Sequence, residues 1–245
     1  MNLLLTRPLD DSKKLESKLK DFDFSIYLAP LIDIKFSEIK TQDYHTKYDV
    51  IIFTSRNSLQ SINPKKISYK DVITIGPGTY EKTIKFGYKN VIRSNGGSSD
   101  LTRLFFKIFK HKKLKVLHPT SNFSTNALEN YFKEQGSYYK KIISYKVKKK
   151  NVNPKKFSEF IKQRGGIVSI FSSKTAESFF ELVQKKNYNE DCKNKILILL
   201  SNSMKPHLGD LMFKKIIIAR RPNEICFMKE LLKFQKKIKK TWHEK

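Results

Sequence analysis

Two pairs of hydroxyl residues stand directly after apolar runs and could bind a carboxylate. Thr54 and Ser55 follow residues 50–53, and Ser172 and Ser173 follow a similar run. A hydroxyl at the end of a strand can cap the next helix or hydrogen-bond to a ligand carboxylate. The residue types allow both roles.

The turn from Gly76 to Thr79 is a second candidate for anion binding. Gly76 and Gly78 permit a tight turn, and Thr79 could cap a helix beginning near Tyr80. The backbone N–H groups of the same turn could instead bind an anion at the carboxyl edge of a sheet. The sequence has neither a GxxxxGK[ST] nor a GxGxxG motif, so it does not predict a nucleotide site.

Two further side chains could contact an anion or a leaving group. Arg7 precedes Pro8, which favours an extended residue before it, and its guanidinium could hold a ligand carboxylate or a neighbouring Asp. Tyr145 lies in a segment that could cross a central cleft, although an aromatic residue in a strand often serves packing alone.

The sequence lacks the residue patterns that other classes of catalytic site require. The histidines at positions 45, 111, 118, 207 and 243 have no metal-ligand spacing, and there is no GxSxG motif. Acids are scarce after the predicted strands, which disfavours a paired-carboxylate hydrolase. Cys192 and Cys226 alone suggest neither a disulfide framework nor a metal site. We expect no metal and a reducing, cytoplasmic environment.

Alternating strands and helices must position these residues. Short apolar runs predict buried parallel strands at residues 3–5, 50–53, 72–75, 114–117, 167–171, 196–200 and 216–219. Amphipathic segments predict helices at residues 11–20, 79–86, 99–109, 125–135, 175–184 and 223–234. This order indicates an α/β protein.

The strand and helix pattern occurs twice. Residues 50–57 and 168–175 both read as strand, hydroxyl pair and helix, residues 73–92 resemble 198–218, and residues 3–8 resemble 116–121. We therefore predict two α/β lobes whose hydroxyl turns face one cleft. The extended stretches 25–36 and 141–148 are predicted to pair between the lobes. The lobes would comprise residues 1–35 with 147–245, and residues 36–146.

The composition is strongly basic. The 245 residues include 50 Lys and Arg against 23 Asp and Glu, a net charge of +27. Because few of the basic residues are Arg, the charge could reflect a Lys-biased composition as well as anionic partners. The stretches 146–156 and 233–245 are expected to be solvated faces or frayed ends. No apolar run approaches the roughly 20 residues of a membrane helix, and the start does not resemble a signal peptide.

The ordered motifs resemble the uroporphyrinogen-III synthase family of tetrapyrrole biosynthesis. These motifs are LLLTRP at the N-terminus, APLIDI (29–34), DVIIFTSRNSL (49–59), ITIGPGT (73–79), SYKV (144–147) and IVSIFSSKTAESF (167–179). Together they cover nearly the whole chain. The resemblance implies two flavodoxin-like α/β lobes with parallel sheets, joined by a two-stranded ladder.

The resemblance also implies a chemistry. It is the cofactor-free cyclisation and dehydration of hydroxymethylbilane, a linear tetrapyrrole polycarboxylate, to uroporphyrinogen III, with inversion of ring D through a spiro intermediate. Tyr145 matches the family's crossing Tyr and would protonate the departing hydroxyl. The matching substrate-binding positions are Arg7, Thr54, Ser55, Asn57, Gly76, Thr79, Ser172 and Ser173. The small-molecule substrate is the only partner implied; we expect a monomer that binds neither nucleic acid nor membrane.

Two turns depart from the family pattern. Ser201-Asn202-Ser203-Met204 replaces a repeated G-x-x-T turn, and His118 stands where many bacterial relatives have an Arg-Gly pair. Both changes put the substrate contacts of these turns in doubt. An alternative is a non-catalytic two-lobed module that binds an anionic ligand or RNA, but the basic and aromatic residues form no recognisable RNA module.

Overall fold

The computed structural model describes residues 1–95, 97–110, 112–150 and 154–243. The chain divides into two compact units. Unit 1 comprises residues 1–33 and 148–245, and unit 2 comprises residues 34–147. Both boundaries fall inside strands, namely β3 (Ile32–Phe36) and β8 (Tyr138–Lys149).

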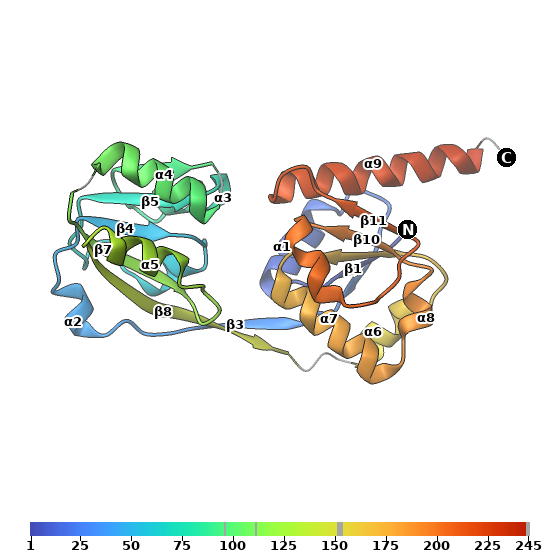
Figure 1. Ribbon diagram of the computed structural model, residues 1–245. Coiled ribbons are helices and arrows are strands. Elements are labelled where there is room, and N and C mark those ends of the chain that lie inside the picture. The colour runs from blue at the N-terminus through green and yellow to red at the C-terminus, as the bar shows by residue number, and fades with distance from the viewer. Residues whose placement is uncertain (96, 111, 151–153, 244–245) are drawn as a thin grey trace. The chain divides into compact units, whose positions relative to one another are not determined.

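Unit 1 is built on a five-stranded sheet in the order β11-β10-β9-β1-β2, with parallel pairing throughout this order (Figure 1). Its strands are β1 (Asn2–Leu5), β2 (Ser25–Leu28), β9 (Ile167–Ile170), β10 (Ile196–Leu199) and β11 (Lys215–Ile218). Its helices are α1 (Leu9–Lys18), α6 (Pro154–Ile161), α7 (Ser173–Lys186), α8 (Asn189–Cys192) and α9 (Glu224–His243), with a 3-10 helix at Asn202–Leu208.

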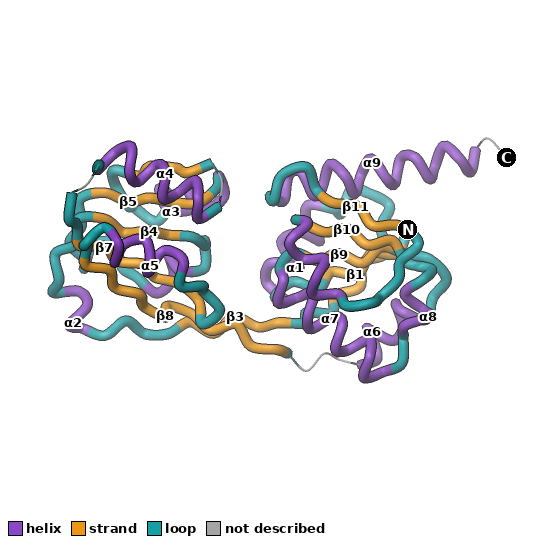
Figure 2. Tube along the Cα trace, viewed as in Figure 1, coloured by secondary structure: helices purple, strands orange, loops and turns teal. Residues whose placement is uncertain are grey.

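The sheet of unit 1 is covered on both faces. Leu3 and Leu5 of β1 pack in one cluster with side chains of α1 and α9, whereas Leu4 packs in the other with α6 and α7. Figure 2 shows these helices around the strands. Because successive strand residues point to opposite faces, burial of both faces requires continuous apolar runs such as residues 3–5.

Unit 2 contains most of a six-stranded sheet in the order β3-β8-β7-β4-β5-β6. Its remaining strands are β4 (Val50–Phe53), β5 (Asp71–Ile75), β6 (Val91–Ser94) and β7 (Lys115–Ser121), and the pairs from β8 to β6 are parallel. Its helices are α2 (Thr41–Tyr44), α3 (Pro77–Lys85), α4 (Ser98–Phe109) and α5 (Ala127–Glu134), with a 3-10 helix at Ser58–Ser61. The core therefore lies on both sides of β4, whose four residues are all buried.

The two sheets follow the internal repeat. In unit 2, β4 precedes a hydroxyl pair and lies between β5 and β7. In unit 1, β9 precedes the other pair and lies between β10 and β1. β7 and β1 belong to the similar segments 116–121 and 3–8, so the strand order is the same in both sheets. Parallel α/β sheets were predicted, and this fold class is confirmed.

The prediction of one extended strand over residues 25–36 was wrong. β2 pairs with β1, whereas β3 is the neighbour of β8 in the other sheet. Pro30 stands between β2 and β3, and a proline has no N–H to continue a ladder. The proposed role of β3 and β8 in joining two lobes stays a prediction.

In the basic stretches expected to be solvated faces or frayed ends, the described lysines at 146–156 and at 233 and 236 are exposed, as expected for solvated faces, although most of them belong to regular elements. β8 extends to Lys149, and α6 begins at Pro154 and buries Phe157, Phe160 and Ile161, while residues 151–153 lie outside the described part of the chain. α9 continues to His243. The lysines next to these apolar residues obscured the helical spacing of α6. Within the described chain, no helix is both long and apolar enough to cross a membrane.

Candidate functional site

Thr54 is linked through hydrogen bonds to two neighbouring strands of unit 2. Its Oγ1 lies 3.1 Å from Nε2 of His118 on β7, and the Nδ1 of this histidine lies 2.6 Å from the hydroxyl of Tyr139 on β8. His118 is buried, and burial together with the charge of Lys141 lowers its pKa to about 4. The imidazole is therefore neutral at pH 7.

The rest of this turn is held by a hydrogen bond between two of its own residues. The Ser55 hydroxyl accepts a hydrogen bond from the amide of Asn57 at 3.2 Å, and a 3-10 helix follows at Ser58–Ser61. Ser55 and Asn57 thus lie together after β4, as the motif predicted. The predicted helix is replaced by this single short turn.

The glycine turn places a helix N-terminus after β5. Gly76 has a φ of 74° and precedes α3, which begins at Pro77. Thr79 is buried inside the first turn, so the expectation that it caps a helix starting near Tyr80 was wrong. The amide of Gly76 donates to the Ser94 carbonyl at 3.0 Å. The amides of Gly78 and Thr79 are first-turn groups without an intrahelical acceptor, so they remain suited to an anion.

Tyr145 follows an irregularity in its strand. The β7–β8 register shifts between Thr120 and Ser121, so Ser121 faces Tyr145 and Ser144 is skipped. Such a bulge changes the direction of the next side chain and often lies beside an active site. Tyr145 as a residue is 7% exposed, and no residue in the described ranges hydrogen-bonds to its hydroxyl.

A groove in unit 2 lies close to this bulge. Its lining includes Phe36, Ser37, Tyr44 and Ser61. The Ser37 amide donates to the carbonyl of Ser144 at 2.9 Å, and the Ser61 hydroxyl donates to the same carbonyl. Two residues that line the groove therefore hydrogen-bond to Ser144, the residue before Tyr145.

The hydroxyls of unit 1 cap helices. The Ser172 Oγ accepts from the Thr175 amide at 3.2 Å, and Ser173 is the first residue of α7. In the turn at residues 201–204, which differs from the family pattern, the Ser201 hydroxyl accepts a hydrogen bond from the Ser203 amide at 3.3 Å. Capping is one of the two roles predicted for Ser172, and ligand binding by Ser172 and Ser173 stays a prediction.

Arg7 is held by acidic side chains of unit 1. Its Nη1 atom lies 2.5 Å from Oε2 of Glu224 at the start of α9, and its Nη2 atom lies 3.5 Å from Oδ2 of Asp11. The guanidinium also lies 4.4 Å from the centroid of the Phe171 ring. The pairing with a nearby Asp was predicted, but Glu224 was missed because it lies more than two hundred residues further along the chain.

Glu224 should make the stability of unit 1 depend on pH. Burial raises its pKa, but hydrogen bonds from Lys18 and Arg7 outweigh burial and lower the pKa from 4.5. The carboxylate therefore stabilises the fold above pH 4.5, and this contribution is lost as the pH falls through the lowered pKa. We expect Glu224→Gln to cost about 1–3 kcal/mol at pH 7 and less at pH 3, measured by chemical denaturation.

The matched control for this prediction is Asp100→Asn, because Asp100 pairs with Arg103 at an exposed site. That variant should change the free energy of unfolding by less than about 0.5 kcal/mol. An equal loss for Glu224→Gln at both pH values would contradict the assigned role of the Glu224 charge.

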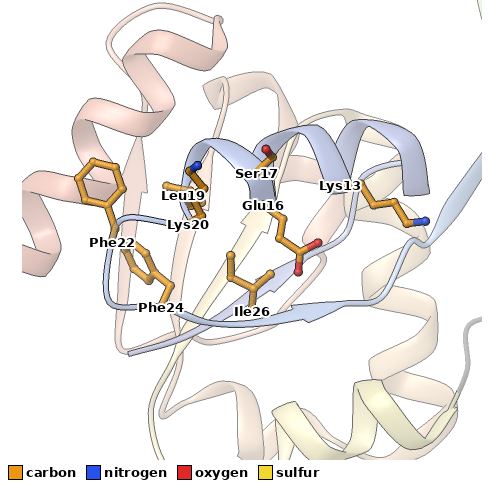
Figure 3. Close-up of a pocket in the computed structure, with 8 residues that line it drawn as sticks. All are labelled: Lys13, Glu16, Ser17, Leu19, Lys20, Phe22, Phe24 and Ile26. Atoms are coloured by element: carbon orange, nitrogen blue, oxygen red, sulfur yellow. The ribbon is translucent and has the colours of Figure 1, made fainter.

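A groove in unit 1 lies apart from the predicted site residues. Figure 3 shows its lining from α1 and the segment leading into β2, with Phe22 and Phe24 at one end, Lys13 at the other and Glu16 between them. None of the residues predicted for substrate binding lines it. In the residues that the structure describes, no group of three His, Cys, Asp or Glu side chains is placed to hold a metal.

Comparisons with known proteins agree with the motifs. A family model described as uroporphyrinogen-III synthase HemD matches residues 13–225. The fold is similar to uroporphyrinogen-III synthetase from Helicobacter pylori, with a TM-score of 0.60 and 15% identity over 95% of this chain and 98% of that chain. It is also similar to a mutant uroporphyrinogen III synthase from Thermus thermophilus, with a TM-score of 0.59 and 12% identity over 98% of this chain and 99% of that chain. A search of curated proteins found no match.

The structural similarities at these identities show the fold, and the family match covers most of the sequence. The resemblance predicted from the ordered motifs is confirmed. The chain belongs to the uroporphyrinogen-III synthase HemD family.

Proposed function

We propose that this protein cyclises and dehydrates hydroxymethylbilane to uroporphyrinogen III, with inversion of ring D and without a cofactor. The observation that carries the proposal is the family match over residues 13–225. The fold supports it, because polar turns follow the strands of a parallel sheet in each unit. In open α/β sheets this edge is the usual place for ligands.

Positioning of the substrate is the main task of this site. The bilane closes unaided to the wrong isomer, so the enzyme must favour one ring closure, and orientation alone can contribute several kcal/mol. In unit 2 the donors are the Thr54 hydroxyl and the amides of Gly78 and Thr79. The net charge of +27 attracts a polycarboxylate.

Tyr145 is the proposed proton donor. The C–O bond of the hydroxymethyl group breaks, the hydroxyl takes the phenol proton, and water leaves. The methylene carbon left behind bonds to the substituted α-carbon of ring D and gives the spiro intermediate. The bond from that α-carbon to its original bridging carbon then breaks, and the bridging carbon bonds to the free α-carbon of ring D, which inverts the ring. The proton that this α-carbon loses restores the phenol. The position of Tyr145 after the bulge and the lack of a hydrogen-bond partner for its hydroxyl among the described residues support this role.

Arg7, Ser172 and Ser173 are the proposed contacts of unit 1. Arg7 would have to exchange the Glu224 carboxylate for one from the substrate. We further propose a monomeric lyase in a reducing cytoplasm, a location that the two unpaired cysteines support.

The test is to supply freshly generated hydroxymethylbilane, oxidise the products and separate the type I and type III uroporphyrin isomers. An excess of type III over a reaction without protein is the expected result. Type I alone, at the spontaneous rate and with folded protein, would reject the synthase activity and favour a binding module.

A further inference from the structure

A chain of three polar side chains crosses neighbouring strands of unit 2. Tyr139 on β8, His118 on β7 and Thr54 after β4 are joined by contacts of 2.6 Å and 3.1 Å. The strands lie side by side in the order β8-β7-β4 (Figure 1). The proposed proton transfer at Tyr145 uses neither Tyr139 nor His118, so their hydrogen-bonded arrangement requires another explanation.

The protonation states of Tyr139 and His118 limit the directions in which the hydrogen bonds between these three side chains can run. Burial raises the pKa of Tyr139, so its phenol keeps its proton at neutral pH. His118 is neutral because burial lowers its pKa. A neutral imidazole has one N–H donor and one nitrogen acceptor, so its two contacts must run in the same direction.

The Tyr139 proton decides that direction. No other hydrogen-bond partner for the phenol is found in the part of the chain that the structure describes. Tyr139 is half-buried, and its 2.6 Å contact with Nδ1 of His118 is the acceptor that the described residues offer to the phenol, so the phenol donates to Nδ1. Nε2 then carries the imidazole proton and donates to Oγ1 of Thr54. The Thr54 hydroxyl keeps its own proton for a further acceptor.

We propose that Tyr139 and His118 are positioning residues that make the Thr54 hydroxyl a dedicated hydrogen-bond donor to a substrate carboxylate. This inference rests on the proposed function, which supplies a polycarboxylate substrate. With the opposite order, Thr54 would donate to His118 and have no proton left for the ligand. The direction of the hydrogen bonds therefore determines which ligand atoms Thr54 can bind.

The first test measures the imidazole tautomer without any substrate. Long-range ¹H–¹⁵N NMR of protein with ¹⁵N-labelled histidine distinguishes the two neutral forms, and loss of one signal in His118→Gln assigns it. We expect the Nε2–H form at pH 7 in the wild type and a mixture of both tautomers in Tyr139→Phe. A wild-type Nδ1–H form would overturn the proposal.

The second test measures binding of uroporphyrin, a stable tetrapyrrole polycarboxylate, by equilibrium titration. Thr54→Val should raise the Kd about tenfold, the effect of losing one hydrogen bond to a charged group, whereas Thr54→Ser should stay within about twofold. Tyr139→Phe should raise the Kd of the wild type severalfold but leave that of Thr54→Val unchanged, because it acts through Thr54. Additive effects would overturn the proposal.

A matched variant distinguishes a positioning role of Tyr139 from a purely structural role. Tyr88 is another tyrosine of unit 2, more deeply buried than Tyr139, and its hydroxyl donates to the Ile62 carbonyl at 3.2 Å. Tyr88→Phe should lower thermal stability as Tyr139→Phe does and leave the Kd unchanged. A wild type that binds uroporphyrin but forms no type III isomer would reject the synthase activity and leave this proposal standing, whereas a wild type that does not bind would reject the proposal itself.

Discussion

Tyr145→Phe is expected to lower kcat for type III uroporphyrinogen formation by about 10²–10⁴-fold, the usual contribution of a positioned proton donor. The substitution removes only the hydroxyl and keeps the ring of a residue that is 7% exposed. KM should change little because the phenol acts on the leaving group. The measurement is the initial rate of type III formation after correction for spontaneous closure.

The fold of this variant should remain intact. No described residue hydrogen-bonds to the Tyr145 hydroxyl, so the free energy of unfolding should change by less than about 1 kcal/mol. Tyr131→Phe is a suitable control, because its part-buried hydroxyl donates to the Thr102 carbonyl at 3.3 Å. A Tyr145→Phe rate within fivefold of the wild type would mean that Tyr145 serves packing.

Lys195→Met should destabilise unit 1 by about 3 kcal/mol or more. Lys195 is fully buried before β10, and its ammonium donates to the carbonyls of Phe160 at 3.0 Å, Gly165 at 2.6 Å and Gln163. These acceptors lie at the end of α6 and in the turn that leads to β9. Methionine has a similar stem but no donor, so three carbonyls would lose their partner.

Thermal denaturation measures this effect. For a protein of this size, 3 kcal/mol corresponds to a decrease in Tm of about 6–12 °C. Lys193→Met is the matched control, because Lys193 is exposed and pairs only with Glu190 at the surface in the contacts described. It should change Tm by less than about 2 °C. Equal decreases in both variants would show that the buried hydrogen bonds of Lys195 contribute nothing specific.

Local patterns were enough to predict the class of fold and the family. The run at residues 50–53 is β4 without any change of bounds, and most other predicted strands differ from the observed ones by a few residues at their ends. These runs are reliable because a parallel strand buried on both faces needs apolar residues at every position. The order of the short motifs then predicted the family, although none of them is specific alone.

The α/β class, the repeated arrangement, and the hydroxyls and glycine turn after the strands all follow from residue patterns along the chain. The folded chain was needed to see that residues 25–36 divide between two sheets, that Arg7 pairs with Glu224, and that Tyr139 reaches Thr54 through His118. Hydropathy and turn propensity are local properties, whereas these contacts join residues that strand order and helix packing bring together.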